Sequence, residues 1–489
     1  MSTTFSELPI AVLGAGPVGL AAVAWLLERQ LPFFAIEAGD RVGANLLEYG
    51  HVRLFSPWEF NVDRMVATLL AASGWTHPDP GELPLAGEVV ERVLQPFSEL
   101  PQVAAALQRN TRVVSVSREG YDKVKSEGRE TAPFVIRAVR NGKTFELPAR
   151  AVIDSTGTWN TANPVGASGL PALGEREAAK HIFYGIPDVL GQHRARYEGK
   201  KVLVVGAGHS AANALLSLAD LAKQCPSTTL VWSVRTPVLT RVFGGGGADA
   251  LPARGALGSS LHRLRDTGAL EFIAGLRVTE IAQEGGKLLV MGIDRHGGAK
   301  RVREVDEIVC ATGQRPNLSL TSELRVALDA ALESTEALGP LIDPNEHSCG
   351  TVRPRGHREL AHPEPGLYTV GVKSYGRAPT FLMATGFEQV RSVVAAIAGD
   401  LKAANRVELE LPATGVCSSR GGATEGAGGG TCCAVPEPLV VAMPLLTSRK
   451  GCGAPAKPPQ IASARSCGCP TEVAATPPAT VKPTTSCCC

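Results

Sequence analysis

Residues 9–40 read PIAVLGAGPVGLAAVAWLLERQLPFFAIEAGD, and the pattern of this stretch decides the fold. A short apolar run predicts a buried strand, three closely spaced glycines predict a turn, and an alanine- and leucine-rich run predicts a helix. The apolar run PFFAIE then predicts a second strand that lies parallel to the first. The stretch therefore predicts one βαβ unit of a doubly wound α/β fold.

The glycines of this unit, Gly14, Gly16 and Gly19, have the spacing G-x-G-x-x-G directly after a strand and at the start of a helix. The first permits a tight turn, the second lets backbone approach a pyrophosphate, and the third allows the helix to pack closely. Glu37 ends the second strand 23 residues after Gly14, near the spacing at which an acid accepts ribose hydroxyls. The unit is thus predicted to bind a dinucleotide.

The same pattern recurs between Lys200 and Arg235, where Gly206, Gly208 and Ala211 form the G-x-G-x-x-A variant. Here the second strand ends without an acid and supplies Arg235. Arginine binds a 2′-phosphate bidentately, whereas an acid would repel it, so this unit favours NADPH over NADH. Two such units on one chain favour two nucleotide-binding domains.

Three other segments extend these units. Hydrophobic alternation bounded by turn signals predicts a β-meander at residues 112–154, and a second strand-rich excursion is predicted at 278–313. Residues 366–401 predict a strand, a glycine-containing loop and a helix that close the first domain. The fold class is therefore α/β, with two Rossmann-like domains and β-meander excursions.

Domain boundaries follow from these patterns. The first domain is expected to comprise residues 1–198 and 316–411, and the second residues 199–315. Residues 412–489 contain no Phe, Trp or Tyr and are rich in Gly, Ala, Pro, Ser and Thr. Such a composition cannot bury enough apolar surface to offset its ordering entropy, so a disordered, cysteine-rich tail is expected there.

The charge balance excludes two broad classes of partner. Lys and Arg total 49 against 47 Asp and Glu, so the net charge of +2 favours neither nucleic acid nor an anionic membrane. No apolar run approaches the ~18 residues of a spanning helix, and no basic segment precedes the first apolar run. We therefore expect a cytoplasmic protein with a small-molecule substrate. A homodimer is left open.

Two further strand ends carry a resemblance to a known family. They are VIDSTGTW, with Thr156 and Gly157, and IVCATGQRPN, with Thr312 and Gly313. With the two nucleotide units, they make residues 8–402 resemble the flavoproteins with two dinucleotide-binding domains. That family includes flavin-containing monooxygenases, thioredoxin reductases, and glutathione or mercuric reductases. The resemblance implies FAD on the first unit, NADPH on the second, and cofactor contacts from these four residues.

The cysteine pattern separates the branches of this family. Residues 38–60 hold no cysteine, and the second domain holds no cysteine pair, so a core dithiol mechanism is excluded. The monooxygenase branch is favoured, and its linker motif is partly matched by Gly174, His181 and Tyr184. In that branch NADPH reduces the flavin, which then reacts with oxygen, while the protein excludes water and supplies hydrogen bonds.

The same resemblance suggests catalytic residues in the segment RLFSPWEFN. Asn61 is a candidate donor to the oxygenated flavin, and Trp58 a candidate cap over the pocket; a turn asparagine and a core tryptophan are the open alternatives. Cys349, in the polar loop DPNEHSCGTVRPRG, is a candidate substrate-facing thiolate, with a plain loop cysteine as its alternative. Cys310 is predicted to be an inert buried thiol, and Cys225 to lie in a turn.

Nine of the 12 cysteines lie after residue 411, which makes compositional noise improbable. Their spacings are not those of zinc fingers, but vicinal thiols suit soft ions that need little imposed geometry. The alternatives are arsenic(III), antimony(III), mercury(II), copper(I) and zinc(II). The candidate metal or metalloid ligands are Cys432, Cys433, Cys467, Cys469, Cys487, Cys488 and Cys489.

Core and tail together resemble the flavin monooxygenases associated with arsenic resistance. The resemblance implies an FAD- and NADPH-dependent oxidoreductase that oxidises a thiol-bound trivalent metalloid, such as an organoarsenical, to the pentavalent form. Two alternatives stay open. One is a flavin-dependent reductase of a soft metal, and the other is a metal-sequestering protein built on a flavoprotein scaffold.

Overall fold

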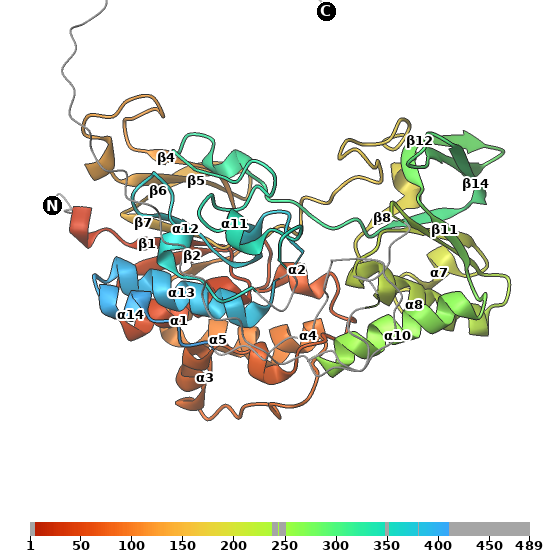
Figure 1. The fold of residues 1–489 in the computed structure, drawn as a ribbon. Helices are drawn as coiled ribbons and strands as arrows, with labels where there is room; N and C mark the ends of the chain where they lie inside the picture. Colours follow the sequence, from red (N-terminus) through yellow and green to blue (C-terminus); the bar gives the residue numbers. More distant parts are fainter. Residues whose placement is uncertain (1–4, 237–242, 244–250, 348–351, 380, 410–489) are drawn as a thin grey trace, which may run out of the picture. The chain divides into compact units, whose positions relative to one another are not determined.

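The computed structural model describes residues 5–236, 243, 251–347, 352–379 and 381–409. By its contacts the chain divides into Met1–Gly422 and Ala423–Cys489, and the described residues belong to the first unit. Two five-stranded sheets, each accompanied by a three-stranded one, organise that unit (Figure 1). The expected tail at residues 412–489 lies outside the described residues.

The first sheet contains the strands of the first βαβ unit and is parallel throughout, in the order β16-β7-β1-β2-β3. Leu13 at the end of β1 lies beside both Ile36 and Asp154, so three strands end level with one another. Buried parallel strands require continuous apolar sequence, as IAVL and AVID provide. The strands are β16 (Leu367–Thr369), β7 (Ala151–Asp154), β1 (Ile10–Leu13), β2 (Phe33–Ile36) and β3 (Leu107–Gln108).

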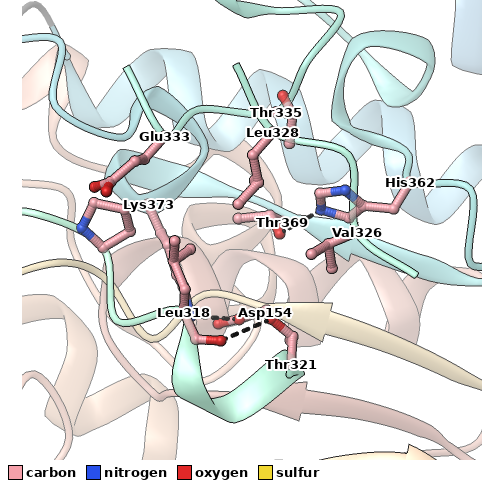
Figure 2. A pocket seen from close by; sticks show the side chains of 11 residues that line it. Asp154, Leu318, Thr321, Val326, Leu328, Glu333, Thr335, His362, Thr369 and Lys373 are labelled. Carbon is pink, nitrogen blue, oxygen red and sulfur yellow. Dashed lines mark hydrogen bonds and ion pairs between the residues drawn. The ribbon is translucent and has the colours of Figure 1, made fainter. Parts of the chain in front are cut away.

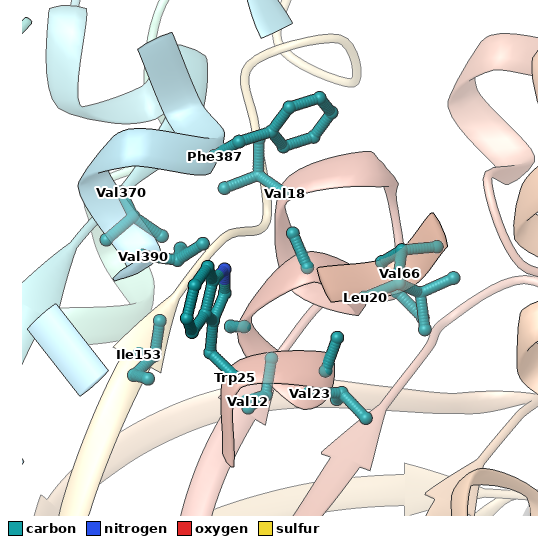
Figure 3. Packing of buried hydrophobic residues seen from close by; sticks show 14 of the residues in the cluster. Val12, Val18, Leu20, Val23, Trp25, Val66, Ile153, Val370, Phe387 and Val390 are labelled. Carbon is teal, nitrogen blue, oxygen red and sulfur yellow. The ribbon is translucent and has the colours of Figure 1, made fainter. Parts of the chain in front are cut away.

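Helix α1 (Pro17–Glu28) packs on this sheet and against α13 (Met383–Ile397). Figure 3 shows Val18 and Trp25 of α1 beside Phe387 and Val390 of α13, with Ile153 below them. The segment that ends in α13 also supplies β16, which pairs with β7. Residues late in the chain therefore add a strand and a helix to the first sheet.

The second sheet is also parallel, in the order β11-β10-β9-β15-β8. Helix α8 (His209–Gln224) and α10 (Pro252–Asp266) pack together on one face. The edge strand β8 precedes residue 199, so the expected domain boundary falls between two strands of one sheet. The strands are β11 (Glu271–Ala274), β10 (Thr229–Val234), β9 (Lys201–Val205), β15 (Glu307–Cys310) and β8 (Ile182–Tyr184).

Both expected excursions form three-stranded antiparallel sheets. The first consists of β4 (Thr111–Arg118), β5 (Phe134–Arg140) and β6 (Lys143–Ala149). The second consists of β12 (Arg277–Glu284), β13 (Lys287–Ile293) and β14 (Ala299–Val305). The α/β fold class with two dinucleotide-binding sheets and meander excursions is therefore confirmed.

Shorter helices fill the loops between these elements. They are α2 (Ala44–Leu47), α3 (Arg64–Ala71), α4 (Ala86–Val89), α5 (Gln95–Glu99), α6 (Pro101–Ala104), α7 (Arg194–Tyr197), α11 (Gly339–Ile342), α12 (His357–Leu360) and α14 (Leu401–Asn405). Two 3₁₀ helices matter below, η2 (Trp58–Phe60) and η8 (Gly371–Tyr375). Among the described helices, none has the length and apolar character needed to cross a membrane.

Candidate functional site

The first glycine turn joins β1 to α1, and two of its glycines are required by packing. Gly14 has φ +95°, and a Cβ atom there would lie 2.8 Å from the carbonyl oxygen of Ser155. A Cβ atom on Gly19 would lie 1.9 Å from the carbonyl oxygen of Gly14. A side chain at either position would push the turn away from its neighbours.

Gly16 lies beside open space, because a Cβ atom there would meet nothing within 4 Å. It is the N-cap of the twelve-residue helix α1, and no side chain caps that end. The first amide groups of a helix carry a partial positive charge and lack partners within the helix. An open cradle at this helix start fits the pyrophosphate of a dinucleotide.

Glu37 directly follows β2, and its carboxylate is fixed at the same edge of the sheet. Its two oxygens accept hydrogen bonds from the backbone amides of Ala15 and Gly39, both at 2.8 Å. The side chain is partly exposed. Its carboxylate therefore lies against the glycine turn, where the adjacent ribose of a nucleotide in that turn would be within reach.

Residues 155–157 form a turn at the end of β7, next to the glycine turn. The Ser155 hydroxyl donates to the carbonyl oxygens of Leu13 at 2.7 Å and Gly14 at 3.0 Å. Thr156 donates through its hydroxyl to Asp154 at 2.7 Å, and Gly157 has φ +71°. Ser155 thus links this turn to the glycine turn.

The second glycine turn repeats this geometry. Gly206 has φ +143°, and a Cβ atom there would lie 2.2 Å from the carbonyl oxygen of Ala311. Gly208 is the N-cap of α8 and, like Gly16, has nothing within 4 Å of its would-be Cβ atom. Ala211 is fully buried in α8. The second turn therefore presents the same open cradle as the first.

Thr312 and Gly313 follow β15 and border this second turn. The Thr312 hydroxyl is positioned to donate to the carbonyl oxygens of Asn163 at 3.0 Å and Pro164 at 3.2 Å, and Gly313 has φ +88°. Asn163 in turn donates to the Thr312 carbonyl at 3.1 Å. These bonds attach the chain's crossing between the domains to the carboxyl edge of the second sheet.

Arg235 follows β10 and borders a groove of about 800 Å³. Its guanidinium group lies 3.4 Å from the carbonyl oxygen of Ala167, and Arg277 lies on the same groove. Leu170 and Leu173 are 69% and 72% exposed and give the groove an apolar rim. Two arginines beside apolar side chains are suited to a ligand with a phosphate and an aromatic base.

Asn61 lies in the predicted segment, but the loop itself occupies its side chain. The side chain is 1% exposed, and its amide donates to the carbonyl oxygens of Ser56 at 2.6 Å and Pro57 at 2.8 Å. Trp58 is also 1% exposed and belongs to the hydrophobic core. The two alternatives, a turn asparagine and a core tryptophan, fit the structure better than a flavin donor and a pocket cap.

Of the linker-motif residues, Gly174 and His181 contact residues of the second domain, and Tyr184 contacts the linker itself. A Cβ atom on Gly174 would lie 2.1 Å from the carbonyl oxygen of Ile281. His181 contacts Glu307 at 3.3 Å, and the Tyr184 hydroxyl donates to Glu175 at 2.8 Å. These contacts fit an ordinary hydrogen-bonded linker histidine.

The two described cysteines form no dithiol. Cys310 is 3% exposed at the carboxyl end of β15, and burial raises the pKa of its thiol to about 11. Cys225 follows α8, which runs back across the sheet, so it lies at the opposite edge. The described residues include no group of three or more His, Cys, Asp or Glu side chains suited to a metal ion. Cys349 and the tail cysteines lie outside the described residues.

Sequence reasoning missed the ion pair between Asp154 and Lys373, which lies behind the turn at residues 155–157. Figure 2 shows the pair beside a small cavity that His362 also borders. Both partners are almost fully buried, at 1% and 3% side-chain exposure. A charged residue ending the apolar strand AVID was the available signal, because a buried charge requires a partner.

The sequence model of the pyridine nucleotide-disulphide oxidoreductases matches residues 8–340, which is most of the described chain. The chain belongs to this family. It is therefore an oxidoreductase, and the family is named for its use of a pyridine nucleotide. No curated protein matches the chain in sequence.

Solved structures of several flavoenzymes share the fold. A bacillithiol disulfide reductase from Bacillus cereus has a TM-score of 0.58 at 17% identity, with 80% of this chain and 99% of that chain covered. A cadaverine monooxygenase from Erwinia amylovora, bound to FAD, has a TM-score of 0.57 at 14% identity, with 84% and 99% covered. An ornithine N-hydroxylase from a Kutzneria species, with reduced FAD and NADP+, has a TM-score of 0.54 at 15% identity, with 81% and 99% covered.

Proposed function

We propose that this oxidoreductase is a monooxygenase that oxidises a thiol-bound trivalent metalloid, such as an organoarsenical, to the pentavalent form. The observation that carries the proposal is the pairing of two open nucleotide turns with described residues that include no cysteine pair. An enzyme with both nucleotides but no thiol relay is suited to passing electrons from the flavin to oxygen.

The first turn is proposed to hold FAD. Gly16 and the first amides of α1 face the pyrophosphate, and Glu37 accepts the ribose hydroxyls. When bound, FAD accepts a hydride from NADPH and activates molecular oxygen. The residues around the turn contribute position and hydrogen bonds, while the buried strands β1 and β7 keep the turn rigid.

The second turn is proposed to hold NADPH. Gly208 and the start of α8 face its pyrophosphate, and Arg235 faces its 2′-phosphate. The groove beside Arg235 supports this assignment because Arg277 adds a second cation there. The apolar rim formed by Leu170 and Leu173 is suited to covering the adenine.

The proposed reaction is balanced with oxygen as the oxidant. The thiol-bound organoarsenical RAs(SR′)₂ first exchanges its two thiolates for two water molecules, which gives RAs(OH)₂ and two thiols, R′SH. RAs(OH)₂ then reacts with O₂, NADPH and a proton to give RAsO(OH)₂, NADP+ and water. The arsenic lone pair forms the new As–O bond, the O–O bond breaks, and the second oxygen atom leaves as water. Arsenic loses two electrons, and NADPH supplies the other two that oxygen requires.

The tail cysteines are proposed to bind the trivalent metalloid. Vicinal thiolates in a glycine-rich sequence suit a soft ion, which needs little imposed geometry. A reducing compartment such as the cytosol would keep these thiols free, so we propose that location. The same thiols also fit a protein that sequesters metal on a flavoprotein scaffold.

The test is the rate of NADPH oxidation by the FAD-loaded protein, with and without methylarsenite, in air. We expect methylarsenite to accelerate NADPH oxidation, and methylarsenate, which is already pentavalent, to have no effect. Equal rates with and without methylarsenite, and no pentavalent product, would refute the proposed substrate.

The second candidate is a reductase of a soft metal ion, favoured only by the abundance of thiols in the chain. It requires electrons to reach the metal without oxygen. NADPH oxidation by mercury(II) under strict anaerobiosis would support this reductase in place of the monooxygenase.

A further inference from the structure

The ion pair between Asp154 and Lys373 connects two segments that are distant in the sequence. Lys373 lies in η8, after the edge strand β16, and its Nζ atom is 2.6 Å from Oδ2 of Asp154 at the end of β7. Both side chains are buried, so water screens the attraction little. The pair therefore constrains the end of β7 more than a surface ion pair would.

Both charged partners also bond to Thr156, which belongs to the turn beside the first nucleotide site. Lys373 donates to the Thr156 hydroxyl oxygen at 3.0 Å. That hydroxyl donates to Asp154 at 2.7 Å, and the Thr156 backbone amide donates to the same carboxylate oxygen at 3.1 Å. Lys373, Asp154 and Thr156 thus form a closed triangle of hydrogen bonds.

The turn at residues 155–157 contacts the glycine turn directly, so a constraint on the first restricts the position of the second. Ser155 donates to the carbonyl oxygens of Leu13 and Gly14, and its own carbonyl oxygen excludes any side chain from Gly14. The path from Lys373 to the glycine turn therefore consists of direct contacts, all between described residues. A shift of this triangle of hydrogen bonds would therefore move Ser155, which the glycine turn contacts.

The cavity behind the pair keeps the triangle in an apolar setting. Its volume of about 10 Å³ leaves room for about one water molecule. Leu318, Val326 and Leu328 line it, together with His362, which lies 2.9 Å from the Thr369 hydroxyl (Figure 2). Besides Asp154 and Lys373, the charged residue Glu333 also lines the cavity, and its carboxylate forms an ion pair with Arg377.

We propose that Lys373 is a positioning residue of the FAD site, which acts through Asp154 and Thr156 on the turn at residues 155–157. The proposal rests on the proposed function only in assigning FAD to the first glycine turn. It predicts that the buried charge pair sets the affinity for FAD as well as stabilising the domain.

The test compares Lys373→Met, Lys373→Arg and Arg391→Met in the full chain, by FAD affinity for the apoprotein and by melting temperature. Arg391 is the matched control, because its pair with Glu388 is 5% exposed at both partners and belongs to α13, not to the turn. We expect Lys373→Met to weaken FAD binding at least about tenfold and Lys373→Arg to restore most of it. Arg391→Met should lower the melting temperature without that loss of affinity.

Lys373→Met leaves the buried Asp154 carboxylate without its charged partner and could therefore fail to fold. Two further variants test the proposal in that case. The pair Asp154→Asn with Lys373→Met removes both charges, and Thr156→Val removes only the hydroxyl that joins them to the turn. Both should fold and bind FAD weakly, with an altered visible spectrum of the bound flavin.

Parental FAD affinity in Lys373→Met, or in the double variant where the single one does not fold, would overturn the proposal. So would equal losses of affinity in Lys373→Met and Arg391→Met. Failure of the parental protein to bind FAD would instead refute the assignment of FAD to the first turn.

Discussion

Gly16 and Gly19 are three residues apart, but the structure assigns them different roles. A methyl group on Gly19 would collide with the Gly14 carbonyl, whereas one on Gly16 would enter open space. We expect Gly19→Ala to lower the free energy of unfolding by about 1–3 kcal/mol or more, because the helix must move. Gly16→Ala should keep the melting temperature of the apoprotein and weaken FAD binding at least about tenfold.

Thermal unfolding of the apoproteins and FAD titration together check this pair. Gly208→Ala is the matched variant of the second turn, and it should weaken NADPH binding while leaving FAD binding unchanged. Unchanged FAD affinity in Gly16→Ala would mean that the open cradle is not the pyrophosphate site.

His362 should make the protein sensitive to acid. Burial lowers its pKa from 6.5 to about 4, so the folded protein keeps this imidazole neutral where the unfolded chain protonates it. The unfolded state then binds more protons between those pH values, and stability must fall as the pH drops from about 6.5 to about 4. The contribution is about 3 kcal/mol. Chemical unfolding of the parent and His362→Gln at several pH values measures it, and parallel pH profiles would contradict it.

At the scale of single residues, the sequence predicts the backbone roles better than the side-chain roles. Gly14 and Gly206 follow from a motif whose steric reason is local. The role of Asn61 does not follow from a motif. Its amide donates hydrogen bonds to Ser56 and Pro57 within its own loop, and no pattern in the sequence indicates these bonds. Lys373 is missed because its partner Asp154 lies 219 residues away.

Arg235 and Arg277 come from different elements but lie on one groove, between the loop at residues 166–173 and the start of β12. We expect Arg235→Ala and Arg277→Ala each to raise the dissociation constant for NADPH about 10- to 100-fold, the loss of one charged hydrogen bond. The dissociation constant for NADH should change little, because NADH lacks the 2′-phosphate. Arg303→Ala, on β14 and paired with Glu284 outside the groove, is the control.

Direct binding of NADPH and NADH, as well as of 2′,5′-ADP alone, checks this prediction. Equal losses for the two dinucleotides would assign the arginines a role other than recognition of the 2′-phosphate.

Elements were predictable where the periodicity was strong. Both βαβ units, both meanders and the closing strand and helix form where the apolar patterns indicate them. The edge strand β8 was not anticipated in the second sheet, since its three residues are too short to carry a period. Its membership depends on pairing with β15, a contact between segments about 125 residues apart in sequence.

At the scale of the whole molecule, removing residues 410–489 separates the core from the cysteine-rich sequence. Nine of the 12 cysteines leave with that segment, while every cofactor-binding candidate remains. We expect the truncated protein to keep its FAD content, melting temperature and kcat with methylarsenite. Its KM for methylarsenite should rise, because the thiols that would bind the metalloid are gone. A rate independent of this segment at all methylarsenite concentrations would contradict the proposed role of the tail thiols in binding the substrate.

The stoichiometry of aerobic turnover tests the central claim most directly. The purified, FAD-loaded protein would be given NADPH and methylarsenite, and the NADPH and O₂ consumed would be compared with the methylarsenate and hydrogen peroxide formed. The account predicts one methylarsenate for each NADPH and each O₂, with little peroxide. NADPH oxidation that yields only peroxide, or that proceeds with a soft metal ion in the absence of oxygen, would contradict it.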